Sequence, residues 1–326
     1  MSMKKLLFIG PNFFNYQDII SEGLRQKGYE VTYFDDRPST SFLMKAIIRL
    51  NKNLVKKSIQ KYFETILESC KQNQYDVVFV IIGQSLYSDM IDKMREVLPN
   101  AKFVFYDWDA IKNFPDREEF SKHFDYCYSF DDEDVKQYPW FKFVPLFYSE
   151  SVDEYIEDQR DSLYIGTIKK GKYAFVHEME EKLNAQGLNN YFYYYIQSKS
   201  VFRYLKWKDP DMKGAKIKDF KFEKVNEKQT YDLMKSSKMI VDVPMKNQNG
   251  LTIRTFEALG FNKKLITTNK HIVNYDFYDP QNIYVYDGEF DFNSDFFTKP
   301  YRMPSKAIKD KYSLSSFLDA LLEEVK

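Results

Sequence analysis

The most informative part of the chain reads Asn249-Gly-Leu-Thr-Ile-Arg-Thr-Phe-Glu-Ala-Leu-Gly260. It predicts a helix that begins near Leu251, with Gly250 freeing the backbone in front of it and Thr252 as a cap. The first N–H groups of such a helix lack partners, and the positive end of its dipole lies beside them. The amino end of the helix is therefore expected to bind an anion, most often a phosphate.

Charged side chains on one face of this helix strengthen that interpretation. Arg254 supplies a cation about one turn in, and Glu257 follows three residues later on the same face, while Ile253 and Phe256 are left for the core. The alternative is an ordinary amphipathic helix, with a solvated Arg/Glu pair and with Gly260 as its left-handed C-terminal stop.

The sequence around the helix favours the anion site. Met239–Val243 and Lys264–Thr267 flank the helix and are typical of buried parallel strands. A strand, loop, helix and strand in this order place the amino end of the helix at the carboxyl edge of a sheet. Open α/β folds bind their ligands at that edge.

At this point the chain resembles the GT-B glycosyltransferases, and among them bacterial enzymes of capsule and lipopolysaccharide assembly. Many of these enzymes carry a Glu, a Gly-rich turn, and a helix with a second Glu before a small residue and a Gly. Glu257-Ala-Leu-Gly260 matches the second half, whereas Gln248 and Asn249 stand where the first Glu would fall. The resemblance implies that Glu257 holds the donor ribose and that the turn with Asn249, Gly250, Leu251 and Thr252, together with the helix end, holds the diphosphate.

The resemblance extends to Tyr106-Asp-Trp-Asp-Ala110 and to Asp276-Phe-Tyr-Asp-Pro280, so it touches both halves of the chain. It implies an α/β protein of two facing Rossmann-like domains with parallel sheets. Residues 1–150 would form the acceptor-side domain, and residues 151–326 would form the domain that binds the nucleotide sugar. The C-terminal helix, whose apolar stripe includes Leu314, Phe317, Leu318, Leu321, Leu322 and Val325, would cross back to the first domain.

Composition agrees with a two-domain enzyme. The chain has 326 residues, 44% of them hydrophobic, and its 48 Lys and Arg balance 48 Asp and Glu. No global field therefore favours nucleic acid as a partner. Cys70 and Cys127 fit a reducing cytosol rather than a metal cluster. The apolar runs are too short for a membrane span or a signal peptide, which predicts a cytoplasmic location.

The first half alternates strands and helices, which predicts a parallel sheet covered on both faces. We expect strands at residues 1–10, 30–34, 76–82 and 102–106 and a helix near Asp18 to Lys27, stopped by Gly28. A basic amphipathic region from Ser41 to Ser69 interrupts this pattern. Two interpretations stand: a solvated helix that covers the sheet, which is favoured, and a surface that rests on anionic lipid at the inner face of the plasma membrane.

The second half begins with a predicted strand at Ser162–Ile165 and a turn, Gly166-Thr-Ile-Lys-Lys-Gly-Lys172. Thr167, Lys170 and Lys172 are candidates for contacts to the diphosphate, with a solvated basic loop as the alternative. Ser198–Lys224 interleaves aromatic and basic residues. We expect an exposed hairpin there by default, and an insertion facing a membrane or an acceptor as its functional interpretation.

Asp107-Trp-Asp109 follows a predicted strand. In GT-A glycosyltransferases an Asp-x-Asp motif presents carboxylates to a divalent metal, which is a second way to read these residues. We instead interpret one of the two, with Asp109 preferred, as the general base that takes a proton from an acceptor hydroxyl. The structural alternatives are a helix N-cap for Asp109 and a turn residue for Asp107.

The sequence thus predicts a metal-independent, hexosyltransferase-like enzyme that moves a sugar from a nucleotide diphosphate to a hydroxyl of a cell-surface polysaccharide or glycolipid precursor. The leaving diphosphate would be stabilised by protein charges, so no metal and no cofactor is predicted. Two other functions stay open: a catalytically inactive subunit that only binds nucleotide sugar, and a nucleotide-sugar epimerase on the same fold.

Overall fold

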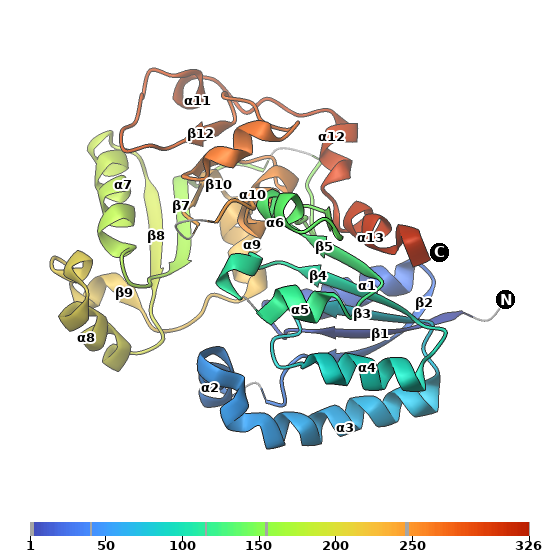
Figure 1. The fold of residues 1–326 in the computed structure, drawn as a ribbon. Helices are drawn as coiled ribbons and strands as arrows, with labels where there is room; N and C mark the ends of the chain where they lie inside the picture. The colour runs from blue at the N-terminus through green and yellow to red at the C-terminus, as the bar shows by residue number, and fades with distance from the viewer. Residues whose placement is uncertain (1–2, 40, 115, 154–155, 245–247, 326) are drawn as a thin grey trace. The chain divides into compact units, whose positions relative to one another are not determined.

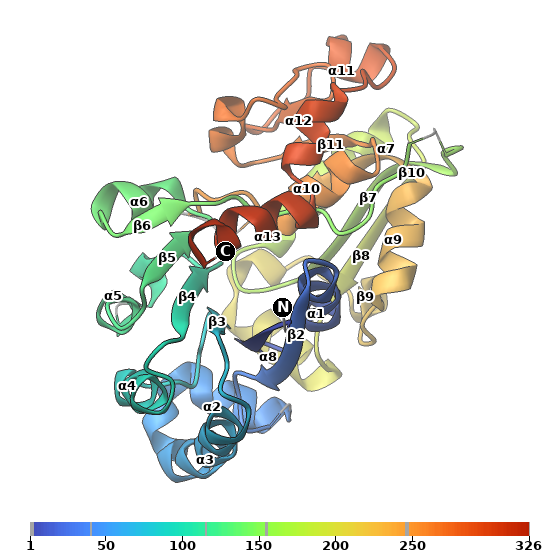
Figure 2. The same cartoon turned by 90° about the vertical axis from the view of Figure 1, so that its right-hand side faces the viewer.

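The computed structural model describes residues 3–39, 41–114, 116–153, 156–244 and 248–325. The chain forms two compact units (Figures 1 and 2). Unit 1 comprises Met1–Leu146 and Leu314–Lys326, and unit 2 comprises Phe147–Ser313. Each has a six-stranded parallel sheet with helices packed against it, as expected for two Rossmann-like domains.

The sheet of unit 1 has the order β2-β1-β3-β4-β5-β6. Its strands are β1 (Lys4–Gly10), β2 (Tyr29–Asp35), β3 (Val77–Ile81), β4 (Lys102–Asp107), β5 (Tyr126–Ser129) and β6 (Phe141–Phe143). The helical elements are α1 (Tyr16–Gln26), α2 (Phe42–Asn51), η1 (Lys52–Val55), α3 (Lys56–Asn73), α4 (Ser88–Val97), η2 (Ile111–Asn113), α5 (Asp116–Ser121), α6 (Asp132–Gln137), α13 (Leu314–Leu322) and η6 (Glu323–Val325).

Both faces of this sheet are buried because its central strands are apolar at successive positions. One face packs against α3 and α4, which lie side by side in Figure 1, through Leu7, Phe63 and Met94. The other face carries α1 and α13. There the ring of Tyr106, from β4, lies 4.9 Å from that of Phe317. The apolar central strands leave polar groups to the ends of the sheet.

The helix α13 closes the core of unit 1 from the far end of the sequence. Its predicted apolar stripe is buried from Phe317 to Val325. It approaches α1 at Gly23, where an added Cβ would lie 2.7 Å from Leu318 Cδ1. Lys27 fixes the same contact, since its Nζ lies 2.7 Å from a carboxylate oxygen of Asp319.

The sheet of unit 2 has the order β12-β11-β10-β7-β8-β9. Its strands are β7 (Arg160–Thr167), β8 (Asn190–Tyr195), β9 (Phe220–Lys221), β10 (Ser237–Asp242), β11 (Lys264–Thr267) and β12 (Ile283–Val285). The helical elements are α7 (Tyr173–Ala185), α8 (Lys199–Lys208), η3 (Pro210–Met212), η4 (Ile217–Asp219), α9 (Glu227–Lys235), α10 (Ile253–Gly260), η5 (Lys270–Asn274), α11 (Asp295–Thr298) and α12 (Lys306–Lys311).

The aromatic and basic segment Ser198–Lys224 forms a helix, short helical turns and a strand rather than the expected hairpin. Ser198 starts α8 because its side chain accepts a bond from Val201 N. Phe202 and Phe220 are buried in the core of unit 2, which ties both ends of the segment down. The expectation of a hairpin was wrong because local capping and aromatic burial outweigh the irregular charge pattern.

Candidate functional site

The loop Asn249–Thr252 and the amino end of α10 follow the carboxyl end of β10 in unit 2. The helix begins at Ile253 rather than near Leu251, and Thr252 occupies its N-cap position. The predicted cap was wrong, because the Thr252 hydroxyl donates to Asp242 Oδ2 at 2.6 Å and makes no capping bond to the helix. The Thr252 side chain therefore does not occupy the first N–H groups of α10. An anion site at this end of the helix needs those N–H groups as donors.

Asn269, which the sequence analysis missed, holds the loop in front of α10. Its side-chain amide donates toward three successive carbonyl oxygens, those of Gln248 at 3.3 Å, Asn249 at 3.0 Å and Gly250 at 3.3 Å. Its own backbone N–H is fixed by the side chain of Thr267 at the end of β11. Because Asn269 is buried, water competes little for these bonds, and they hold the loop in one conformation.

The half-buried carboxyl group of Asp242, at the end of β10, lies within the electrostatic influence of two of the predicted cations. Burial raises the pKa of Asp242, while the hydroxyl of Thr252 and the charges of Arg254 and Lys172 oppose that rise. Lys172 Nζ donates to the carbonyl oxygen of Val243 at 2.6 Å, and burial lowers the pKa of this amine. Asp242 is a site residue that sequence reasoning missed. It was visible only as the last residue of an apolar strand.

Arg254 and Glu257 share one face of α10 as predicted, with 3.7 Å between Arg254 Nε and Glu257 Oε2. The alternative of a solvated surface pair is wrong, since Glu257 is only 4% exposed. A buried carboxylate beside a cation is well placed for hydrogen bonding to hydroxyl groups.

Gly260 is also not the left-handed helix stop that the alternative required. It is the last residue of α10, and an added Cβ would lie 2.5 Å from the carbonyl oxygen of Glu150. The left-handed residue is Asn262, with a φ of 55°. Because Gly260 has no side chain, the backbone at Glu150 can pack directly against the end of α10.

The loop after β7 supplies fewer of the predicted contacts. The strand extends two residues beyond the predicted Ile165, so Gly166 and Thr167 pair with Tyr194 and Tyr195 instead of forming the turn. Lys170 is exposed, and Thr167 is half-buried. Lys172, the last residue of this loop, is placed at the carboxyl end of β10 by its bond to the Val243 carbonyl oxygen.

In unit 1, Asp107 ends β4 and is fully buried. Its Oδ1 accepts a bond from the guanidinium of Arg117 and another, at 3.1 Å, from the backbone N of Asp109. Burial raises the pKa of Asp107 to about 7, against the opposing charge of Arg117. An interior carboxyl group paired in this way is suited to positioning its neighbours.

Asp109 is half-buried and lies two residues beyond the strand. The alternative role of helix N-cap is wrong, because Ala110 occupies that position of η2. Asp134, another residue that sequence reasoning missed, holds the chain two residues beyond Asp109. Both of its carboxylate oxygens lie 3.2 Å from Ile111 N, and Ser129 donates to it at 2.8 Å. The segment that carries Asp109 is thus anchored on both sides.

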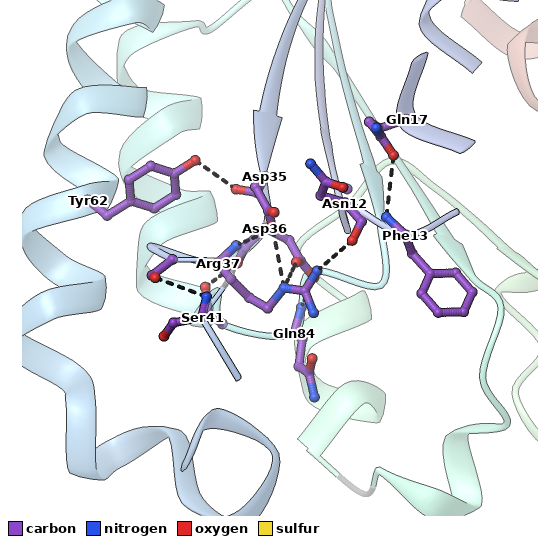
Figure 3. Close-up of polar contacts among 12 residues, drawn as sticks. Asn12, Phe13, Gln17, Asp35, Asp36, Arg37, Ser41, Tyr62 and Gln84 are labelled. Atoms are coloured by element: carbon purple, nitrogen blue, oxygen red, sulfur yellow. Dashed lines mark hydrogen bonds and ion pairs between the residues drawn. The ribbon is translucent and has the colours of Figure 1, made fainter. Parts of the chain in front are cut away.

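Another buried carboxyl group that was missed from the sequence, that of Asp36, lies directly after β2 (Figure 3). Asp36 accepts a bond from Gln84 N at 2.9 Å, and Arg37 Nε lies 3.1 Å from its other oxygen. Burial raises the pKa of Asp36. The same Nε donates to Asp35 Oδ1 at 3.2 Å, while the Tyr62 hydroxyl donates to the Asp35 carbonyl oxygen. This network ties the loop ends of β2 and β3 together.

Membrane-spanning helices and metal-binding clusters are both absent from the part of the chain that the structure describes. Within it, no helix is both long and apolar enough to cross a membrane. The same residues contain no group of three His, Cys, Asp or Glu side chains arranged to hold a metal ion.

Comparisons with known proteins bear on the fold. No protein-family model matches the chain, and no curated protein matches its sequence. Solved structures do match. HepE of Anabaena, in a crystal structure with UDP-glucose, has a TM-score of 0.63 at 9% identity, over 98% of this chain and 99% of its own. The α,α-trehalose 6-phosphate synthase of Burkholderia multivorans has a TM-score of 0.60 at 9% identity, over 99% of this chain and 96% of its own.

This chain has the GT-B fold. The resemblance drawn from Glu257-Ala-Leu-Gly260 is confirmed at the level of the fold. The alternative of a single metal-centred GT-A domain is wrong, since two parallel Rossmann-like sheets are present. At 9% identity this likeness shows the fold alone.

The raised pKa of Asp107 has a consequence for stability. A carboxyl group that binds its proton more tightly in the folded state destabilises that state as the pH rises from about 4 to about 7. We expect Asp107→Asn to flatten the fall in unfolding free energy over this window, by at most about 1.4 kcal/mol per pH unit. Thermal and urea unfolding at several pH values measure the slope. The exposed Asp89→Asn is the control, and an unchanged slope in Asp107→Asn would contradict the assignment.

Proposed function

We propose that the protein is a glycosyltransferase that moves a sugar from a nucleotide diphosphate to a hydroxyl of a cell-surface polysaccharide or glycolipid precursor. The observation that carries this proposal is the placement of two cations near the carboxyl end of β10: Lys172 bonds to the carbonyl oxygen of Val243, and Arg254 lies in the first turn of α10. The GT-B fold supports it, as does the UDP-glucose in the crystal structure of HepE.

The proposed donor site lies in unit 2. The N–H groups at the start of α10, with Arg254 and Lys172, would hold the diphosphate, and the loop of Asn249, Gly250 and Leu251 would shape the site in front of them. These groups would also stabilise the charge that develops on the leaving diphosphate, with no need for a metal ion.

The remaining donor contacts follow from the resemblance and from position. Glu257, buried one turn beyond the cations, would accept bonds from the donor ribose. Gly166 and Thr167 end the neighbouring strand β7, and Lys170 lies exposed in the loop that follows. We assign these three to the rim of the site, with weaker effects than Arg254.

Unit 1 would supply the base. Asp109 is half-buried, whereas Asp107 is enclosed and bound to Arg117, so Asp109 is the carboxylate we assign to the acceptor proton. Asp107 then acts through the backbone of Asp109 as a positioning residue. Arg117 also lines a hollow of about 260 Å³ in unit 1, together with Gln84, Phe114 and Arg49. Its mixed apolar and polar lining suits part of an acceptor.

The donor site makes a first prediction for binding. Arg254→Ala should weaken the binding of a nucleoside diphosphate about tenfold or more, because one charge-assisted contact is lost. Calorimetry with UDP, TDP and GDP, with and without EDTA, measures this, and binding should survive EDTA. Arg203→Ala, an exposed arginine on α8, is the matched control. Equal affinities of Arg254→Ala and the parent protein would exclude α10 as the diphosphate site.

The base makes a prediction for turnover. Asp109→Asn should keep the donor affinity but lower transfer to an acceptor by about two to four orders of magnitude, the range for losing a positioned proton acceptor. Rates are measured with a verified donor and acceptor, with Asp89→Asn as control. Normal turnover would show that Asp109 is not the base. Donor conversion without any acceptor would instead identify an epimerase, and donor binding without turnover in the parent protein an inactive subunit.

We also propose that unit 1 contacts an anionic lipid surface. Leu50, at the end of α2, and Leu54, in η1, are 85% and 74% exposed, and the exposed cations Arg49, Lys56 and Lys57 accompany them. Apolar side chains amid cations are typical of peripheral contact with anionic lipid. The buried face of α3, with Ile59 and Phe63, is used by the core and is not part of this surface.

The proposed lipid contact is tested by replacing its two leucines. The double variant Leu50→Ser, Leu54→Ser should bind vesicles containing phosphatidylglycerol about tenfold or more weakly, because two apolar side chains no longer enter the interface. Vesicle flotation at low and high salt gives the measurement. The double variant Ile217→Ser, Val273→Ser removes exposed apolar side chains from unit 2 as a control. Equal flotation of both double variants would refute the lipid contact.

A further inference from the structure

Unit 2 contains a second hollow, of about 550 Å³, which lies away from α10. It opens near the amino ends of β7 and β8, whereas the proposed donor site lies at carboxyl ends of the same sheet. We call it the tyrosine groove. Its lining residues are Gln159, Arg160, Tyr191, Tyr193, Glu223, Lys224, Val225, Gln229, Asp232, Leu233 and Ser236.

The groove exists because the last strand of the sheet is short. β9 pairs only with Tyr194 and Tyr195, the last two residues of β8. The chain then leaves the sheet and returns through α9, which packs against β7 and β10 and contributes Gln229, Asp232 and Leu233 to the lining of the groove. The first half of β8 therefore has no strand paired along this edge in the described chain, and its side chains form the floor of a groove that α9 borders.

Two aromatic rings form that floor. Because side chains alternate along a strand, Tyr191 and Tyr193 share one face of β8, while Phe192 and Tyr194 enter the core on the other. Their ring centroids are 6.3 Å apart, and the ring of Tyr191 is in part open to solvent, with 38% of the residue exposed. Tyr193 is held by a bond of 2.8 Å from its hydroxyl to the carbonyl oxygen of Glu223.

The walls of the groove are polar, and their charges balance. Arg160 and Lys224 supply two cations, and Glu223 and Asp232 supply two anions. Arg160 is fixed in place, since its Nη1 donates to Ser236 Oγ at 2.6 Å and its guanidinium lies 5.9 Å from the centroid of the Tyr191 ring. A groove without net charge offers no advantage to a phosphate, a nucleic acid or an acidic peptide.

We propose that the tyrosine groove binds a segment of neutral oligosaccharide, separately from the donor and acceptor sites. The apolar C–H face of a sugar ring packs on an aromatic ring, and its hydroxyl groups bond to planar carboxylate, amide and guanidinium groups, which are the groups found here. The volume is within the range of small-molecule sites. Holding one part of a long glycan in the groove would raise the local concentration of the rest.

The experiment measures binding alone, so it does not depend on the proposed transfer reaction. The probes are maltotriose, cellotriose and tri-N-acetylchitotriose, observed by saturation-transfer NMR and titrated at millimolar concentrations. At least one should bind, and Tyr191→Ala should weaken it about tenfold, because the stacking surface is lost. Tyr204→Ala removes an exposed tyrosine from α8 and should leave binding unchanged. Asp232→Asn, an exposed change on α9, gives a second variant that should weaken binding without touching the floor.

Three results would overturn the proposal. One is that none of the three trisaccharides binds. Another is that Tyr191→Ala and Asp232→Asn, with melting temperatures equal to that of the parent protein, bind as the parent does. The third is that saturating nucleoside diphosphate, or Arg254→Ala, abolishes trisaccharide binding, since the sugar would then occupy the donor site. Retained trisaccharide binding in a protein without transfer activity would support the groove and contradict only the proposed function.

Discussion

The burial of parallel strands on both faces is the constraint on which the rest of this structure depends. In β1, β3 and β4, apolar side chains enter the cores above and below the sheet, so polar groups find room only where the strands end. Asp36 follows β2, Asp107 ends β4, and Asp242 ends β10. These three carboxyl groups therefore lie at the carboxyl edges of the two sheets.

Removing a carboxylate from water at such an edge costs free energy unless hydrogen-bond donors or cations surround it, and each of these three carboxyl groups has such partners. Asp36 interacts with Arg37 and a backbone N–H, and Asp107 interacts with Arg117. Two threonine hydroxyls bond to Asp242, and two cations act on it electrostatically. Burial still raises the pKa of each one. Asp107 and Asp242 also fix the loops next to them, since Asp107 accepts a bond from Asp109 N and Asp242 accepts one from the Thr252 hydroxyl before the start of α10.

Local pattern was enough to predict the alternation of strands and helices and a helix near Ile253–Gly260, although its start was placed near Leu251, because such elements depend on residues close together in the sequence. The alternation in turn predicted the parallel sheets. Lys264–Thr267 was predicted with its observed bounds. The partners of the site were not predictable in this way. Asn269 reaches back to three carbonyls some twenty residues earlier, and Arg117 finds Asp107 only once a strand and a helix have packed. Such contacts leave no periodic signal. Thr252 fits a cap by its type, yet its hydroxyl donates to the carboxyl group of Asp242 instead.

The position of α13 has a consequence for the order in which the protein forms during synthesis. Residues 314–325 complete the core of unit 1, although the strands that they cover are made first. Unit 2 is contiguous in sequence and can finish folding while those apolar strands still lack one cover. The unit that leaves the ribosome first is therefore completed last, and its exposed face around Tyr106 needs protection for as long as the second unit takes to be translated.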